Sequence, residues 1–267
     1  MRAILTYHSI DESRSAISVP RDVFERHVTW LGSGAVHVTT VDELMTVPDD
    51  SDAVAITFDD AFESVATIAA PLLRERGLPA TVFVVTEHAG LTNTWGGRAA
   101  SGIPVMPLLD WSSLAALAES GFSLGAHSRT HPDLTKVDPD ALRDEVLGSV
   151  DTIERKAGVR PSCFAYPYGR VNAAVAAVAA SVYTGAVTTE LRPVRSDDSR
   201  FLLPRIDAYY FQAPGRLERW GSPHWHAYLK TRAMLRGLRG VLGSPKGLNY
   251  GRLGSPKGLD YYGQVSS

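Results

Sequence analysis

Short apolar runs alternate with amphipathic segments along most of the chain. The apolar runs, rich in β-branched residues, predict strands, and apolar residues spaced three and four apart predict helices. We expect strands at 3–7, 53–58, 80–85, 122–126, 162–166 and 183–188, and helices at 22–31, 62–76, 111–120, 139–156 and 173–181. This alternation is typical of βα units with a mainly parallel sheet. We therefore predict an α/β fold, a distorted (β/α)7-type barrel.

Polar motifs follow several of these strands. His8 comes after the first strand, Asp59 and Asp60 end the second, and the pair His127 and His131 follows another. The segment 167–169 (Pro-Tyr-Gly) follows a later strand. Because the carboxyl ends of parallel strands share one face, and that face carries the chemistry, these motifs are expected to meet there.

The residue types suit a one-metal hydrolase. Asp60, His127 and His131 offer one carboxylate and two imidazoles, which suit a divalent ion and leave a coordination position for water. We expect zinc, and we expect the two histidines, four residues apart, on one side of a helical turn. Asp59 is then the candidate base and His8 the candidate acid. Spacing alone does not divide the roles of the two aspartates; either could instead cap the next helix, and His8 could be a structural histidine at a strand end.

These motifs resemble the polysaccharide deacetylases (NodB-homology domains, carbohydrate esterase family 4). The sequence TFDDA (57–61) is similar to the family's TFDDG, and GAHSRTHPDL (125–134) resembles its metal motif. FAYPYGR (164–170), LPRIDA (203–208) and LTYHSI (5–10) resemble segments of its permuted, exopolysaccharide-type branch. The resemblance covers about residues 1–210.

The resemblance implies a role for each matching residue. Asp59 would be the base, Asp60, His127 and His131 the metal ligands, and His8 the acid, while the backbone N–H of Tyr168 would help to stabilise the oxyanion. Two departures stand out. Ala61 replaces the family's glycine, and Cys163-Phe164-Ala165 stands where the third motif usually has an arginine, so Arg205 is our candidate to take over that arginine's role at the base.

Composition limits the partners, the disulfides and the cellular location that we expect. The net charge of −2 over 267 residues predicts no nucleic-acid partner, and the single cysteine, Cys163, excludes an internal disulfide. The first ten residues lack the apolar length of a signal peptide, so we expect a cytoplasmic protein.

The chain changes character after about residue 212. We expect the barrel over 1–212 and a basic, Gly/Pro-rich extension over 213–267, which contains an 11-residue repeat at 242–263. Segment 224–263 could contact an anionic membrane from the cytoplasmic side through a basic amphipathic helix. The alternative is a helix packed on the barrel with a solvated basic face.

The motifs together favour removal of an N-acetyl group from an amino sugar, as a glycan linked to a nucleotide or a lipid or as a sugar metabolite. The same site could serve a deformylase or an O-deacetylase. A non-catalytic carbohydrate-binding protein is the alternative of a different class.

Overall fold

The computed structural model describes residues 1–98 and 100–242. Its strands are β1 (Arg2–Tyr7), β2 (Ser9–Ile10), β3 (Ser18–Val19), β4 (His37–Thr39), β5 (Ala53–Phe58), β6 (Thr81–Val84), β7 (Ser123–Ala126), β8 (Cys163–Ala165), β9 (Gly185–Val187) and β10 (Ile206–Asp207). Its α-helices are α1 (Arg21–Leu31), α2 (Val41–Leu44), α3 (Ala70–Glu75), α4 (Trp111–Glu119), α5 (Pro139–Ala157), α6 (Ala173–Ala180) and α7 (Pro223–Leu242). Single turns of other helix types lie at Val65–Ala69, Thr86–His88, Trp95–Gly97, Pro167–Gly169 and Ala208–Phe211.

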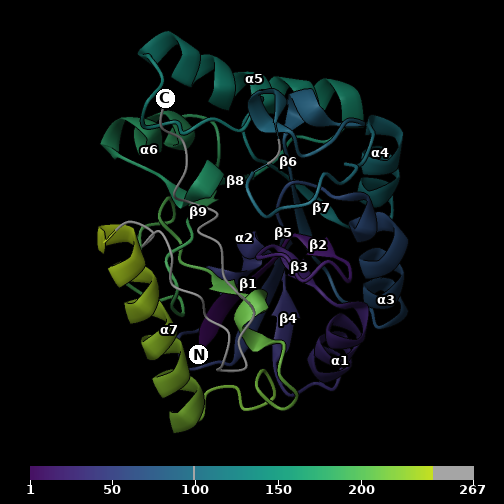
Figure 1. Cartoon of the computed structure of the whole chain (residues 1–267), viewed down its shortest axis with the longest axis vertical. Coiled ribbons are helices and arrows are strands. Elements are labelled where there is room, and N and C mark those ends of the chain that lie inside the picture. The colour runs from purple at the N-terminus through teal and green to yellow at the C-terminus, as the bar shows by residue number, and fades with distance from the viewer. Residues whose placement is uncertain (99, 243–267) are drawn as a thin grey trace.

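A curled parallel sheet forms the centre of the molecule. Its strands lie in the order β10-β1-β5-β6-β7-β8-β9, and β4 pairs with β5 beside this path. Leu203, just before β10, forms a parallel bridge with Val187 of β9, so the two ends of the curled sheet approach each other. The helices surround this sheet, with α5 along the top, α3 and α4 on one side and α7 on the other (Figure 1). The predicted barrel-type α/β fold is confirmed.

The two faces of the sheet carry different residues. On β5, Val54, Ile56 and Phe58 pack in the large cluster under the helices, whereas Ala53 and Ala55 belong to a smaller cluster on the other face. This alternation follows from the two-residue period of a strand. This other face therefore carries apolar side chains, which range from Ala53 and Ala55 to Phe83.

The expected helix over 62–76 is present but contains a π-turn. Phe62 forms a bridge with Leu108, Glu63 and Ser64 are the first helical residues, Val65–Ala69 is a π-helix, and α3 continues from Ala70. Pro71 lies in the first turn of α3 and has no N–H to continue an α-helical ladder from the preceding turn, which fits a π-turn at this point. The short strands β2, β3, β4 and β10 carried too little apolar pattern to be predicted.

Helix α7 packs on the barrel with its first half. Trp225 and Leu229 are 2% and 3% exposed and belong to the main core, whereas Met234, Leu235 and Leu238 are exposed. Among the described helices, none combines the length and the apolarity needed to cross a bilayer. The membrane contact and the boundary at residue 212 stay predictions, and residues 243–267, which hold most of the repeat, lie outside the described part.

Candidate active site

Four segments meet at the carboxyl ends of the strands, and a fifth joins them from the start of β10. His8 follows β1, Asp59 and Asp60 follow β5, and His127 follows β7. Tyr168 lies in the turn after β8, and Arg205 immediately precedes β10, the neighbour of β1. The predicted site residues are therefore brought together by parallel strands that lie side by side, as expected.

The turn after β5 separates the two aspartates. Asp60 and Ala61 both have left-handed backbones, with φ of 67° and 57°. This turn allows Asp59 to face Arg205 while Asp60 faces the two histidines. Ala61 thus adopts a conformation that glycine reaches without steric cost, so the family's glycine has a physical explanation here.

Asp60, His127 and His131 form a buried cluster. The Asp60 Oδ1 atom lies 3.5 Å from His127 Nε2 and 3.6 Å from His131 Nε2, and the two Nε2 atoms are 3.2 Å apart. His127 Nδ1 lies 2.7 Å from the Ala165 carbonyl and donates its proton there, which leaves the Nε2 lone pair facing the cluster. Burial lowers the pKa of both histidines and so favours their neutral, metal-binding forms.

This donor set fits a divalent metal ion. Each of the three residues offers one ligand atom, and these three atoms lie within 4.8 Å of one another. A neutral His131 that turns its Nε2 lone pair toward that of His127 at 3.2 Å would repel it, and a cation between them would remove this repulsion. One carboxylate oxygen and two imidazole nitrogens are ligands that zinc and related ions accept.

The expected helical turn for the two histidines was wrong. Residues 127–131 form a loop after β7, and Ser128 and His131 have φ of 65° and 63°. Ser128 Oγ accepts the His131 N–H at 3.0 Å. The loop, not helical spacing, therefore aims both rings at one point.

Glu145 of α5 holds this loop in place through hydrogen bonds. Its Oε2 accepts the backbone N–H groups of Arg129 at 2.8 Å and Thr130 at 2.9 Å, and its Oε1 accepts the Thr130 hydroxyl at 2.5 Å. Glu145 is 8% exposed. One buried carboxylate thus satisfies three donors of the loop that carries the candidate metal ligands.

Asp59 is bound by Arg205 and lies near His8. Arg205 donates to both Asp59 oxygens, at 2.6 and 2.7 Å, and both side chains are almost fully buried. Burial by itself would raise the pKa of Asp59, but the charge of Arg205, then His127 and the Arg205 hydrogen bonds, hold it well below its usual range. His8 Nε2 lies 3.9 Å from Asp59 Oδ2, and burial lowers the pKa of His8 to about 4. Asp59 is therefore ionised and His8 neutral at pH 7.

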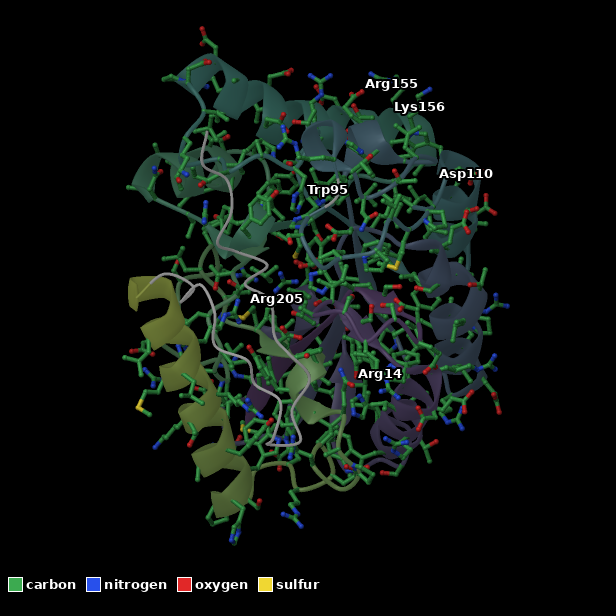
Figure 2. All side chains as sticks on the ribbon, in the orientation of Figure 1. Arg14, Trp95, Asp110, Arg155, Lys156 and Arg205 are labelled. Carbon is green, nitrogen blue, oxygen red and sulfur yellow. The ribbon has the colours of Figure 1, made fainter. Side chains whose placement is uncertain are left out.

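Aromatic rings surround the His131 side of the cluster. Trp95 stacks on the His131 ring with centroids 4.6 Å apart, and Tyr168 meets the same ring edge-on at 4.6 Å. Tyr168 has a φ of 59°, which turns the backbone of its loop sharply beside the cluster. Trp95 and Arg205 come from segments far apart in the sequence. In Figure 2 Trp95 is labelled above the centre of the view and Arg205 near the centre.

Some supporting residues were missed from the sequence. Arg170 pairs with Asp133 at 2.5 Å, which joins the Tyr168 loop to the histidine loop. Asp133 and Arg170 lie inside the quoted motifs 125–134 and 164–170, and this position was a signal for both. Glu145 lies in the expected helix over 139–156, and nothing local in the sequence marks it or Trp95 as part of the site.

Several known proteins resemble this chain in sequence. The polysaccharide deacetylase family model matches residues 46–185, just over half of the 267 residues. YxkH of Bacillus subtilis (strain 168), which carries a polysaccharide deacetylase name, is 27% identical over 209 residues, 76% of this chain and 70% of its own. The poly-beta-1,6-N-acetyl-D-glucosamine N-deacetylase of Staphylococcus epidermidis is 23% identical over 203 residues, 71% of this chain and 67% of its own.

The fold has a matching counterpart among solved structures. The structure of IcaB from Ammonifex degensii superposes with a TM-score of 0.66 at 21% identity and covers 86% of this chain and 97% of its own. This likeness concerns the fold, and the family assignment rests on the family model. The chain belongs to the polysaccharide deacetylase family.

Proposed function

We propose that this protein is a metal-dependent hydrolase that removes the N-acetyl group from an amino sugar within a glycan and releases acetate. The observation that carries the proposal is the pairing of two buried units in one site. The Asp60, His127 and His131 cluster suits a cation, and the ionised Asp59 lies beside it with neutral His8 within 3.9 Å. Membership of a deacetylase family supports an acetylated sugar as substrate.

The proposed metal centre is built from Asp60, His127 and His131, with zinc as the expected ion. A divalent cation held there would polarise the acyl carbonyl and lower the pKa of a water molecule toward about 7. The backbone N–H of Tyr168 would stabilise negative charge on the carbonyl oxygen, since hydrogen-bond donors aimed at a developing oxyanion stabilise the transition state.

Asp59 and His8 divide the proton transfers. Ionised Asp59 accepts a proton from the attacking water, and Arg205 keeps the carboxylate oriented. Neutral His8 cannot donate a proton to a leaving amine until it has received one. Asp59 can supply it through a bridging water molecule, because the 3.9 Å between Asp59 Oδ2 and His8 Nε2 is too long for a direct hydrogen bond. His8 then protonates the leaving nitrogen, which yields the free amine and acetate and restores both groups.

The N-acetyl assignment has support from a relative. The Staphylococcus epidermidis relative is named for deacetylation of poly-beta-1,6-N-acetyl-D-glucosamine, which makes an N-acetylglucosamine polymer the first substrate to offer. Carriage of the sugar on a nucleotide or lipid, and a cytoplasmic location, remain part of the proposal.

Mass spectrometry on a panel of acetylated sugars tests the proposal. The panel contains N-acetyl, O-acetyl and N-formyl sugars, with the protein stripped by a chelator and then given zinc, cobalt or no metal. We expect loss of one acetyl group from an N-acetyl member, dependent on metal and abolished in Asp59→Asn. Metal-bound protein that leaves every N-acetyl sugar intact, or that acts only on esters or formamides, contradicts it.

A further inference from the structure

The two histidines of the candidate metal cluster are held in different ways. His127 donates from Nδ1 to the Ala165 carbonyl at 2.7 Å, which is the usual arrangement for a metal-binding histidine, because a hydrogen bond at the second ring nitrogen fixes the direction of the first. The Nδ1 atom of His131 is also buried, but none of the residues that the structure describes forms a hydrogen bond with it. The direction of the His131 ring must therefore be set by other contacts.

Neighbouring rings enclose the His131 side chain. The indole of Trp95 stacks on it with centroids 4.6 Å apart and an interplanar angle of 27°. Tyr168 meets it edge-on at 4.6 Å, and His127 does so at 4.8 Å. Aromatic rings in stacked and edge-to-face arrangements attract each other beyond the effect of the area they bury. The stack sets the plane of the His131 ring, and this plane decides where Nε2 points.

Trp95 is itself anchored by its own loop. Buried Asn93, two residues earlier, accepts the Met106 N–H at 2.8 Å and donates to the Pro104 carbonyl at 3.0 Å. The ring of His88 meets the Trp95 ring edge-on at 4.7 Å. Trp95 also packs against a small apolar cluster, separate from the main core, that consists of Ile17, Phe62, Ile103 and Leu108. The loop therefore presents the indole to His131 from an anchored position.

The stack between Trp95 and His131 has an electronic consequence. The face of an indole carries the negative part of its quadrupole, and tryptophan is the strongest aromatic partner for a cation. An imidazole that is bound to a divalent cation through Nε2 is more electropositive than a free, neutral one. The stack should therefore be stronger in the metal-loaded protein than in the metal-free protein, and this difference adds to metal affinity.

We propose that Trp95 is a positioning residue for the candidate metal ligand His131. Its indole takes the place of the hydrogen bond that holds His127, and it raises the affinity of the site for a divalent ion. This inference rests on the metal centre of the proposed function. In it Trp95 acts on a ligand and does not contact the sugar.

The test compares three variants with the wild type. Trp95→Leu removes the aromatic ring, and Trp95→Phe keeps a ring in the same place. Trp111→Leu makes the first change again at a half-buried tryptophan at the start of α4, which packs against the main core. Circular dichroism with a chelator present checks that each protein is folded. Zinc affinity is then measured by competition with a chromophoric chelator, and the visible absorption of the cobalt-loaded proteins reports the geometry of the ligands.

We expect Trp95→Leu to lose at least about tenfold in zinc affinity, as supporting residues of metal ligands typically do. Trp95→Phe should stay within about threefold of the wild type, because a phenyl ring can still stack. Trp111→Leu should match the wild type. The cobalt spectrum should change in Trp95→Leu and not in Trp111→Leu. A wild type that binds no zinc, unchanged affinity in Trp95→Leu, or equal losses in Trp95→Leu and either other variant would overturn the inference.

These measurements need no sugar, so the inference and the proposed function can fail separately. If no acetylated sugar is deacetylated but zinc affinity depends on the ring at position 95, the proposed function fails and the role of Trp95 stands. If an N-acetyl sugar is deacetylated and zinc affinity does not depend on that ring, the reverse is true. Unchanged zinc affinity together with a raised KM for the sugar would make Trp95 a substrate contact and would also overturn the inference.

Discussion

Arg205 clamps Asp59 with two hydrogen bonds of 2.6 and 2.7 Å, although the two residues are 146 positions apart in the chain. The pair lies in the interior, where an ion pair is stable only if both charges are satisfied. Arg205 also donates through Nε to the Thr188 carbonyl, so its guanidinium is fixed from two sides. The orientation of the candidate base is therefore set by a residue that is distant in the sequence but only two strands away in the sheet.

Removal of the arginine should destabilise the protein strongly. Arg205→Gln leaves Asp59 as an unpaired buried charge, at a cost of about 3 kcal/mol or more in the free energy of unfolding. Asp59→Asn/Arg205→Gln removes both charges and should be more stable than Arg205→Gln alone. Denaturant unfolding in the presence of a chelator measures this. Additive effects of the two substitutions would contradict a coupled pair.

The same variant should reverse a pH dependence. In the wild type the pKa of Asp59 is depressed, so its contribution to stability is present above its unfolded pKa and is lost as pH falls through the folded value. Without Arg205, burial raises the pKa, and stability should instead fall as pH rises. The difference in unfolding free energy between the wild type and Arg205→Gln, measured at pH 5 and at pH 8, shows which sign holds, because the buried histidines are present in both proteins.

His8→Gln should impair catalysis according to the leaving group. An amine must be protonated to leave, whereas 4-nitrophenolate leaves without a proton. We expect a loss of about 100-fold or more in kcat on an N-acetyl sugar and a much smaller loss on 4-nitrophenyl acetate. His224→Gln, on the exposed start of α7, is the matched control. Equal losses on amide and ester would exclude the acid role.

Glu145→Gln should weaken metal binding without touching a ligand. The amide keeps the size of the carboxylate but accepts fewer hydrogen bonds from the Arg129 and Thr130 donors. Supporting residues of this kind typically affect metal affinity by about 10- to 100-fold, and we expect a loss in that range. Competition with a chelator measures it, with Asp151→Asn on the exposed face of α5 as control. Unchanged affinity would show that the loop holds its shape without Glu145.

His27 should make the protein sensitive to acid. Its Nδ1 lies 3.0 Å from the Tyr7 hydroxyl and its Nε2 3.1 Å from the Phe211 carbonyl, and burial lowers its pKa to about 4. The unfolded chain therefore binds a proton that the folded protein refuses between about pH 6.5 and pH 4. As pH decreases from about 6.5 to about 4, the free energy of unfolding should therefore decrease by up to about 3 kcal/mol.

Comparison with His27→Gln isolates this effect. Glutamine cannot take up the proton, so the variant should have a shallower dependence of the unfolding free energy on pH in the same window. Both proteins are measured by denaturant unfolding at several pH values. Identical slopes would assign the acid sensitivity to other groups.

Ala61→Gly should leave stability unchanged or raise it by up to about 1 kcal/mol, although most substitutions of buried residues destabilise. The left-handed backbone at Ala61 is strained with a side chain, and glycine relieves that strain at some cost in the entropy of the unfolded chain. Thermal unfolding checks the sign. A loss above about 1 kcal/mol would mean that the buried methyl group contributes more than the strain costs.

The sequence by itself predicted most of the strand and helix order of the barrel, without β2, β3, β4 and β10, and it marked candidate site residues that the fold brings together. Apolar strands such as Ala53–Phe58 end at polar residues, and parallel strands deliver those residues to one face whatever the details of the loops. The family motifs then suggested a role for each. These features depend on the local pattern of apolar and polar residues and on the order of strands and helices, and both can be read from the sequence.

Tertiary structure alone decided how the side chains are oriented. The left-handed turns at Asp60, Ala61, Ser128 and His131 replace the expected helical geometry, because contacts from distant segments offset the local strain. Glu145 supports a loop 15 residues away, and Arg205, 146 residues from Asp59 in the sequence, binds it in the folded chain. Hydrogen bonds between residues so far apart leave no periodic signal in a sequence, so only the folded chain reveals which partners meet.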